Sequence, residues 1–265
     1  MRHVRIAEAV MASPSSPHNK FLGVSFCLLS QNQVVELILG HCSEPFRYVV
    51  TPNAYHIALI HDEPDRMLPV YDGAWLSLCD SRILRALAAF DGRALPLVTG
   101  SDLVEALLSA LNARDVTRLP RQILVVGSDH SAETKLRSAY PNVTIEVLPA
   151  PKNLEHDSVE RLAIARACMD RHWDILLLCV GCPAQELIAH QLAVLRCTSG
   201  IALCVGASID FLTGARTRAP RWVQKLSLEW AYRLAQEPGR LWHRYLVQSP
   251  KVLRIYLETR SPHER

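Results

Sequence analysis

Residues 174–195 read DILLLCVGCPAQELIAHQLAVL: a run of apolar residues, then a glycine, then a stretch with helical spacing. A short apolar run bounded by a turn residue is typical of a buried strand, and apolar residues three and four apart indicate one face of a helix. The glycine between them suits a tight turn at the strand end. This stretch therefore predicts one strand–turn–helix unit.

The same order recurs along the chain. Further apolar runs with strand character occupy residues 23–29, 47–50, 122–126, 144–148 and 201–205. Segments with helical spacing follow most of them, at residues 33–40, 53–60, 132–139 and 158–170. Such alternation predicts an α/β fold with a Rossmann-like, mainly parallel sheet and helices on both faces.

Ligands of such sheets bind outside the carboxyl ends of the strands. Three of the expected ends are marked by glycine: Gly127, Gly181 and Gly206. Glycine lets backbone amides approach a phosphate or a sugar closely, although a tight turn uses it equally well. No dinucleotide or Walker pattern follows any of these strands, which argues against a nucleotide-binding oxidoreductase.

The composition fits a globular protein. The 265 residues are 49% hydrophobic, and the longest uninterrupted apolar run covers residues 175–180. A membrane-spanning helix needs about 20 apolar residues, so none is predicted. Residues 1–20 lack the apolar run of a secretory signal, which predicts a flexible tail on a cytoplasmic protein.

Eight cysteines are present, and most lie among apolar residues. Without an export signal, reduced thiols in the core are expected rather than disulfides. Cys179 and Cys182 form a C-x-x-C pair, which would suit a redox dithiol or half of a zinc site. A structural zinc site needs four ligands and the chain has no second pair, so we favour core cysteines and expect no metal.

Positive charge is concentrated at the C-terminal end. The chain has a formal net charge of +3, whereas residues 216–265 hold eleven Lys and Arg against four Glu, a net of +7. The same segment contains three of the five tryptophans, Trp222, Trp230 and Trp242. Basic and aromatic residues together suit an anionic membrane surface. Nucleic acid is the competing partner, and a solvated basic face on packed helices is the third interpretation.

Three regions follow from these patterns: a flexible tail at residues 1–20, an α/β core at residues 21–215, and a basic helical C-terminal appendage at residues 216–265. The appendage is expected to hold two helical stretches, because a Pro-Gly pair at residues 238–239 interrupts the pattern. Apolar residues near 34–38 would pack either within the chain or against another copy, which leaves a homo-oligomer open.

Four segments, in this order and at these distances, resemble the bacterial WecG/TagA/CpsF family of glycosyltransferases. The first is TPNA at residues 51–54, and the second is CD at 79–80 with GSDL at 100–103. The third is GCPAQE at residues 181–186. The fourth is VGASIDFLTG at 205–214, continued by RAP at 218–220, LEWAYRL at 228–234 and EPGR at 237–240. The resemblance covers residues 20–250, and the fourth segment is its most specific part.

The resemblance implies an inverting enzyme that moves a hexose or N-acetylhexosamine from a UDP-sugar to a sugar on polyprenyl diphosphate. N-acetylmannosamine, its uronic acid and glucose are the implied donor sugars, and the product would enter envelope polysaccharide or exopolysaccharide. It implies no metal, no other cofactor and no nucleic-acid partner. We expect the protein at the cytoplasmic face of the membrane, with the appendage closing the donor site and contacting anionic lipid.

An inverting transfer needs one carboxylate to take the proton from the acceptor hydroxyl as it attacks. Asp80 matches the base proposed for the family. Asp72 is a rival, because the family has Gly after its Asp, as Asp72 does and Asp80 does not. The distances along the chain from Thr51 and to Asp102 favour Asp80. Without a catalytic role, Asp80 would cap the helix expected after it.

Other family positions are expected to bind substrates. Arg233, Arg240 and Arg244 would offset the charge of the leaving diphosphate through bidentate hydrogen bonds. The remaining expected binding residues are Thr51, Asn53, Gly127, Gly181, Gln185, Glu186, Gly206, Asp210 and Arg218. Taken singly, these residues have simpler explanations: helix caps, a Glu beside a helix dipole, tight turns and solvated charges.

The chain departs from the family at several positions. Leu97 and Ala184 stand in place of an Arg and a Lys, and His243 stands where an Arg is common. Either Arg82 or Arg93 supplies the charge lost at Leu97, or the activity is altered. An alternative function, a catalytically impaired scaffold that binds the lipid-linked acceptor or partner enzymes, rests on Leu97, Ser81 and His243.

Overall fold

The computed structural model describes residues 17–42, 45–113, 122–151, 153–220, 222–223 and 228–260. Most of the expected tail, residues 1–16, lies outside this part of the chain. The last residues of that segment belong to strand β1 (His18–Phe21), so the ordered chain includes residues that the sequence assigned to the tail.

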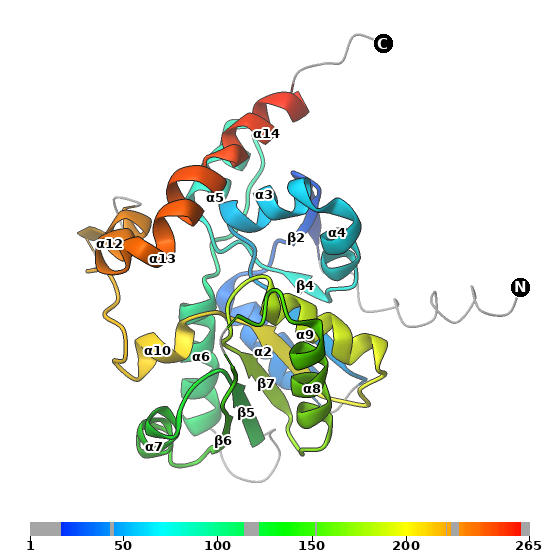
Figure 1. Cartoon of the computed structure of the whole chain (residues 1–265), viewed down its shortest axis with the longest axis vertical. Coiled ribbons are helices and arrows are strands. Elements are labelled where there is room, and N and C mark those ends of the chain that lie inside the picture. Colours follow the sequence, from blue (N-terminus) through cyan, green and yellow to red (C-terminus); the bar gives the residue numbers. More distant parts are fainter. Residues whose placement is uncertain are drawn as a thin grey trace, which may run out of the picture.

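A parallel sheet of six strands lies at the centre of the molecule, in the order β4-β3-β8-β7-β5-β6 (Figure 1). Its strands are β3 (Arg47–Val50), β4 (Leu76–Ser77), β5 (Gln122–Val126), β6 (Thr144–Leu148), β7 (Ile175–Leu178) and β8 (Ile201–Cys204). Cys204 pairs with both Val50 and Leu178, so three neighbouring strands end level. The expected α/β fold with a parallel sheet is confirmed.

Helices cover both faces of the sheet (Figure 1). One face packs against α3 (Ala54–Asp62), α4 (Pro64–Asp72), α5 (Arg82–Phe90), α8 (Ser158–Met169) and α9 (Ala184–Val194). The other packs against α2 (Gln31–His41), α6 (Gly100–Ala113), α7 (His130–Ala139) and α10 (Ser208–Leu212). In β7, Leu176 and Leu178 enter the first core while Ile175 and Leu177 enter the second. Burial on both faces explains why central strands such as β7 and β8 read as unbroken apolar runs.

The run at residues 23–29 was expected to be a strand of the main sheet, and this expectation is wrong. Its residues form β2 (Val24–Cys27), which pairs antiparallel with β1 in a separate hairpin. The turn residues Leu22 and Gly23 have φ angles of 49° and 85°, and positive φ at both positions is typical of two-residue hairpin turns. An apolar run alone does not reveal which strand will pair with it.

Helix α2 contains the apolar residues near 34–38, for which the sequence leaves open both packing within the chain and packing against another copy. Val34, Val35, Ile38 and Leu39 are all buried in the second core, between α2, α6 and the sheet. These side chains therefore pack within the chain.

The appendage contains α12 (Glu229–Gln236), α13 (Pro238–Trp242), the π-helix η1 (His243–Gln248) and α14 (Lys251–Arg260). Residues 222–223 are helical, α12 begins at Glu229, and residues 221 and 224–227 lie outside the described chain. Pro238 is the first residue of α13, a position that suits its fixed φ and missing N–H. Val252, Ile255 and Tyr256 of α14 are buried in the first core.

Candidate active site

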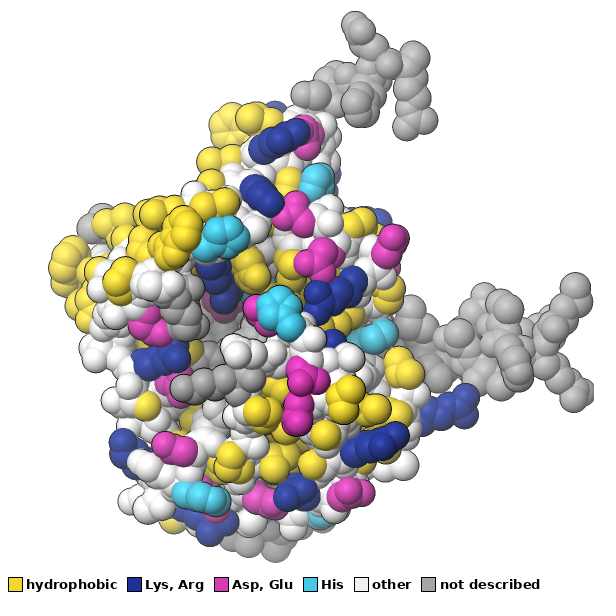
Figure 2. All heavy atoms as spheres, in the orientation of Figure 1, with side chains coloured by type: hydrophobic (Ala, Val, Ile, Leu, Met, Phe, Trp, Pro, Cys, Tyr) yellow, Lys and Arg dark blue, Asp and Glu magenta, His cyan; other side chains and the backbone are white. Residues whose placement is uncertain are grey.

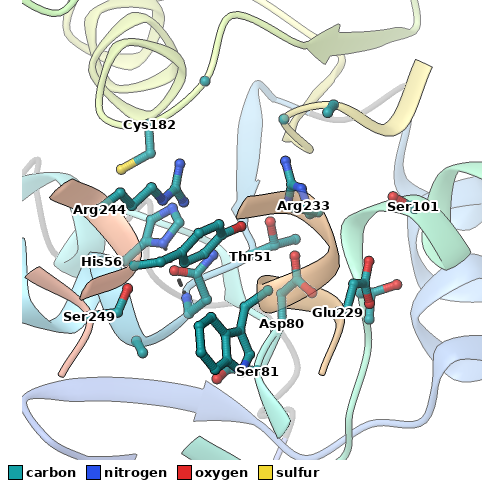
Figure 3. A pocket seen from close by; sticks show the side chains of 18 of the residues that line it. Thr51, His56, Asp80, Ser81, Ser101, Cys182, Glu229, Arg233, Arg244 and Ser249 are labelled. Atoms are coloured by element: carbon teal, nitrogen blue, oxygen red, sulfur yellow. Dashed lines mark hydrogen bonds between the residues drawn. The ribbon is translucent and has the colours of Figure 1, made fainter. Parts of the chain in front are cut away.

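The carboxyl ends of β3, β4, β7 and β8 open into a cavity of about 530 Å³ that α12, η1 and α14 line from the other side (Figure 3). Ten of the thirteen residues that the sequence assigned to the site line this cavity: Thr51, Asn53, Asp80, Gly181, Gln185, Gly206, Asp210, Arg218, Arg233 and Arg244. The topology therefore brings together segments that are far apart in the sequence.

Asp80 lies just beyond the carboxyl end of β4. Its backbone N–H donates to the carbonyl of Pro52 at 3.1 Å, which continues the pairing of the two strands past their ends. The helix that follows is capped by Ser81, whose hydroxyl accepts from the N–H of Leu84 at 3.2 Å. Because Ser81 provides the cap, the Asp80 carboxylate is left to face the cavity.

Asp72 occupies a different place. It is the last residue of α4 and is exposed, and it is not among the residues that line the cavity. It precedes β4, whereas Asp80 follows it. Of the two candidate carboxylates, only Asp80 lies at the end of the sheet where the cavity opens.

Burial and neighbouring charges make Asp80 a weak acid. Burial raises the pKa of Asp80 to about 7, and the carboxylate of Glu229 adds to this effect. The backbone amide of Gly100 and the guanidinium of Arg233 oppose the rise in pKa, while Asp102 contributes to it. A carboxylate with a pKa near neutrality is partly ionised at pH 7 and basic enough to accept a proton from a hydroxyl.

Thr51 and Asn53 have structural partners as well as cavity-facing positions. The Thr51 hydroxyl donates to the carbonyl of Cys204 at 2.8 Å, which links the ends of β3 and β8. Asn53 is the N-cap of α3, because its side-chain oxygen accepts from the N–H of Tyr55 at 3.1 Å. The capping explanation for Asn53 is thus correct, and it leaves the Asn53 amide group at the cavity wall.

A buried network beneath the cavity orients Gln185. Its side-chain oxygen accepts from the N–H of Gly206 at 2.9 Å, and its Nε2 donates to Glu186 Oε1 at 2.7 Å. Glu186 is fully buried and does not line the cavity. Burial pushes the pKa of Glu186 upward, but His56 and the Gln185 amide hold it below its usual range.

His56, Cys182 and Glu186 form a group with the spacing of metal ligands, because their ligand atoms lie within 4.8 Å of one another. His56 Nδ1 accepts from the N–H of Asn53 at 3.2 Å, so Nε2 carries the proton of the neutral ring. That Nε2 lies 3.4 Å from Glu186 Oε1. The hydrogen bond to Nδ1 therefore directs the Nε2–H of His56 toward Glu186, an arrangement that leaves no ring lone pair free for a metal ion. All eight cysteines are free thiols.

Two arginines of the appendage face the cavity (Figure 3). The Arg233 guanidinium lies over the ring of Phe211 at 5.5 Å, and that of Arg244 lies over the ring of Tyr55 at 4.4 Å. Stacking on a ring leaves the N–H edge of a guanidinium available for an anion. His243 is exposed, so Arg244 is the cavity-lining residue of this pair. Arg240 belongs to α13, but its side chain lies outside the described structure.

Asp210 and Arg218 hold the appendage to the core through ion pairs. Arg216 connects Asp210 Oδ2, at 2.9 Å from its Nε, with Glu237 Oε1, at 3.0 Å from its Nη1. Arg218 Nη2 lies 2.7 Å from Asp102 Oδ1. Substrate binding was the role expected for Asp210 and Arg218, and the structure adds this tethering role, which the sequence did not indicate.

Gly127 does not line the cavity. It has a φ of +99°, and a Cβ at this position would lie 2.7 Å from Val180 Cγ1 and 3.1 Å from the carbonyl carbon of Cys179. Glycine at this position therefore allows the ends of β5 and β7 to approach each other closely.

The structure distinguishes Arg82 from Arg93 as the residue that could replace the positive charge lost at Leu97. Arg82 lines the cavity together with Leu97 itself. Arg93 instead donates to the carbonyl of Lys20 at 2.6 Å, at the hairpin, and is not among the cavity-lining residues. Arg82 is the one of the two that is positioned to act in the site.

Sequence reasoning missed His56, Arg216 and Glu229. Glu229 lies within the LEW part of the fourth motif segment, which could have drawn attention to it. Arg216 was counted only as one of many basic residues, and His56 lies in an apolar helical pattern that indicates a core position. No sequence pattern shows that Glu229 approaches Asp80, that Arg216 pairs with Glu237 or that His56 lies beside Glu186.

Comparison with known proteins identifies the family of the chain. The Glycosyl transferase WecG/TagA/CpsF family matches residues 19–265. The N-acetylglucosaminyldiphosphoundecaprenol N-acetyl-beta-D-mannosaminyltransferase of Bacillus subtilis (strain 168) is 26% identical over 168 residues, 62% of this chain and 61% of the relative. The protein of the same name from Bacillus spizizenii (strain ATCC 23059 / NRRL B-14472 / W23) is 35% identical over 92 residues, 35% of this chain and 33% of the relative.

The chain thus aligns with less than two thirds of the length of either relative. The family match, in contrast, extends over almost the whole chain, from the first hairpin to the end of the appendage. It includes every segment that contributes residues to the cavity. The chain therefore belongs to the WecG/TagA/CpsF family of glycosyl transferases.

Proposed function

We propose that the protein is an inverting glycosyltransferase that moves a sugar from a UDP-sugar to a sugar carried on polyprenyl diphosphate. The main observation in support is the cavity in which the weakly acidic Asp80 lies together with Arg233 and Arg244. A base for a hydroxyl and cations for a leaving diphosphate are the two requirements of this reaction. The acceptor named for both Bacillus relatives, N-acetylglucosaminyldiphosphoundecaprenol, belongs to the proposed acceptor class.

In the proposed reaction, an acceptor hydroxyl oxygen bonds to the anomeric carbon of the donor. The bond from that carbon to the β-phosphate oxygen breaks, and its electron pair leaves with the diphosphate. Asp80 takes the proton of the attacking hydroxyl. Arg233 and Arg244 offset the charge that gathers on the diphosphate, so the reaction proceeds without a metal ion.

The donor sugar is N-acetylmannosamine, its uronic acid or glucose, and the product enters envelope polysaccharide or exopolysaccharide. N-acetylmannosamine is favoured, because the names of both relatives specify its transfer. Gly181, Gly206 and the remaining amide hydrogen of Gln185 would contact the nucleotide or the donor sugar from the sheet side of the cavity.

The appendage is proposed to bring the protein to the inner face of the cell membrane. Figure 2 shows hydrophobic side chains gathered over α12, α13 and α14. Trp222, Trp242 and Leu246 in this region are 65%, 51% and 55% exposed. Aromatic and aliphatic groups among basic residues suit an anionic lipid surface, where a lipid-linked acceptor is found. Among the described residues, no helix has the length and apolar character needed to cross a bilayer.

A panel of UDP-sugars and a synthetic polyprenyl-diphosphate-sugar acceptor tests the proposal, with UDP release measured in EDTA. Acceptor-dependent turnover that persists in EDTA and falls by about 10²- to 10⁴-fold in Asp80→Asn is expected, since that is the usual contribution of a general base. Turnover lost in EDTA would refute metal independence. UDP binding without turnover of any donor would favour the scaffold function instead.

A further inference from the structure

Glu229 lines the wall of the cavity that faces the core. It is the first residue of α12 and is partly buried, and its side chain lines the same cavity as Asp80. Figure 3 shows the two carboxylates beside each other, one from α12 and the other from the end of β4. Two carboxylates so placed interact repulsively when both are ionised.

Other charged groups face Asp80 from the elements packed around it. On α12, Arg233 accompanies Glu229, and on α6 the amide of Gly100 and the carboxylate of Asp102 approach Asp80. On α5, Arg82 lines the cavity.

These acidic neighbours differ in their pairing. Asp102 is ion-paired with Arg218 at 2.7 Å. Glu229 forms no ion pair within the described part of the chain. Of the two, only Asp102 has an ion-pair partner among the described residues.

We propose that Glu229 is a positioning residue of the transfer reaction, which acts through Asp80 by favouring the movement of the acceptor proton onto it. The proposal rests on the proposed function. During the transfer, the proton leaves the acceptor oxygen and binds to Asp80, whose negative charge is neutralised. That neutralisation relieves the repulsion from Glu229, so the fixed charge of Glu229 helps the step.

This arrangement links the strength of the base to the appendage. Asp80 belongs to the core and Glu229 to α12, so the two carboxylates face each other only when α12 lies over the cavity. The proximity of Glu229 thus makes Asp80 a stronger base, and Arg233 of the same helix lines the cavity as well.

The test is the pH dependence of kcat for the full-length wild type, Glu229→Gln, Glu229→Asp and Glu258→Gln. Glu258 is the matched control, because it is an acid of the same appendage that pairs with Arg254 at 2.7 Å and does not line the cavity. We expect the acid limb of Glu229→Gln to move down by about 0.5 to 1 pH unit, since a lost like charge makes Asp80 more acidic. Glu229→Asp should restore most of the wild-type profile, and Glu258→Gln should retain it.

A direct measurement of Asp80 complements the kinetics. The carboxyl carbon-13 resonance of Asp80 should titrate at lower pH in Glu229→Gln than in the wild type, without any substrate present. An unmoved acid limb and an unmoved titration in Glu229→Gln would overturn the proposal, even if the variant were slower at every pH. Retained turnover in Asp80→Asn would instead refute the base assigned under the proposed function, so the two failures are distinguishable.

Discussion

Arg218 Nη2 lies 2.7 Å from Asp102 Oδ1, which joins the start of the appendage with the first turn of α6. The second carboxylate oxygen of Asp102 accepts from the Thr99 hydroxyl at 2.7 Å, so both oxygens are engaged. Asp102 belongs to the second motif segment and Arg218 to the fourth. Their contact places two distant segments at the edge of one cavity.

Loss of this contact should weaken the attachment of the appendage. Arg218→Ala and Asp102→Asn are expected to show a coupling energy of about 0.5 to 1 kcal/mol in a double-mutant cycle measured by urea unfolding, the range for partly exposed ion pairs. If the effects of the two substitutions on the free energy of unfolding simply add, a direct stabilising contact is contradicted.

Asp80→Asn should stabilise the protein at high pH. The pKa of Asp80 is about 7 in the folded protein, above the ordinary value of 3.8, so the folded state binds more protons between these values and the free energy of unfolding falls as pH rises through them. Removing the ionisable group should raise Tm by several degrees at pH 8, since about 1 kcal/mol corresponds to roughly 2 to 4 °C for a chain of this size. At pH 4 the gain should be much smaller. Equal changes in Tm at both pH values would contradict the raised pKa.

Arg233 is expected to act on the donor. Arg233→Ala should lower kcat/KM for the UDP-sugar by roughly 10- to 100-fold, because a charge-assisted contact to a diphosphate contributes about 1.5 to 3 kcal/mol. Arg233→Lys should recover only part of the loss, since Lys retains the charge but not the bidentate geometry. Unchanged steady-state kinetics in Arg233→Ala would exclude this role.

Membrane binding should depend on the exposed aromatic and aliphatic side chains of the appendage. Trp242→Ala combined with Leu246→Ala is expected to reduce cosedimentation with vesicles of anionic phospholipid, because both side chains are exposed on α13 and η1. Val159→Ala is a suitable control, since Val159 is 74% exposed on α8 of the core. Equal binding by all three proteins would count against lipid contact through this surface.

Substitution of Gly127 should affect the stability of the protein more than its binding of the donor. Gly127→Ala is expected to lower the free energy of unfolding by about 1 to 3 kcal/mol, because its Cβ would crowd Val180 and because alanine disfavours a φ of +99°. The KM for the donor should change little in the folded fraction. A stable variant with weakened donor binding would restore the role that the sequence suggested.

The sequence alone revealed the strands that are buried on both faces. The run at residues 122–126 coincides with β5, whose four residues after Gln122 are all buried, whereas β6 at residues 144–148 is an edge strand in which exposed and buried positions alternate. It also indicated that Gln185 and Gly206 share a site, because segments after parallel strands meet at one edge of the sheet, whereas Asp80 was assigned to that site only by the family resemblance. It failed for β2, whose apolar residues pair with β1 instead of the main sheet.

What the sequence determined is therefore the local order of strands, turns and helices and the residue types at strand ends, because these depend on neighbours along the chain. The tertiary structure alone decided which distant charges meet. The approach of Glu229 to Asp80 and the link from Arg216 to Glu237 depend on where α12 and α13 lie relative to the core, and the burial of Glu186 beside His56 depends on how α9 packs against the sheet. Electrostatic effects follow from distance and burial, and neither is encoded in the spacing of residues along the chain.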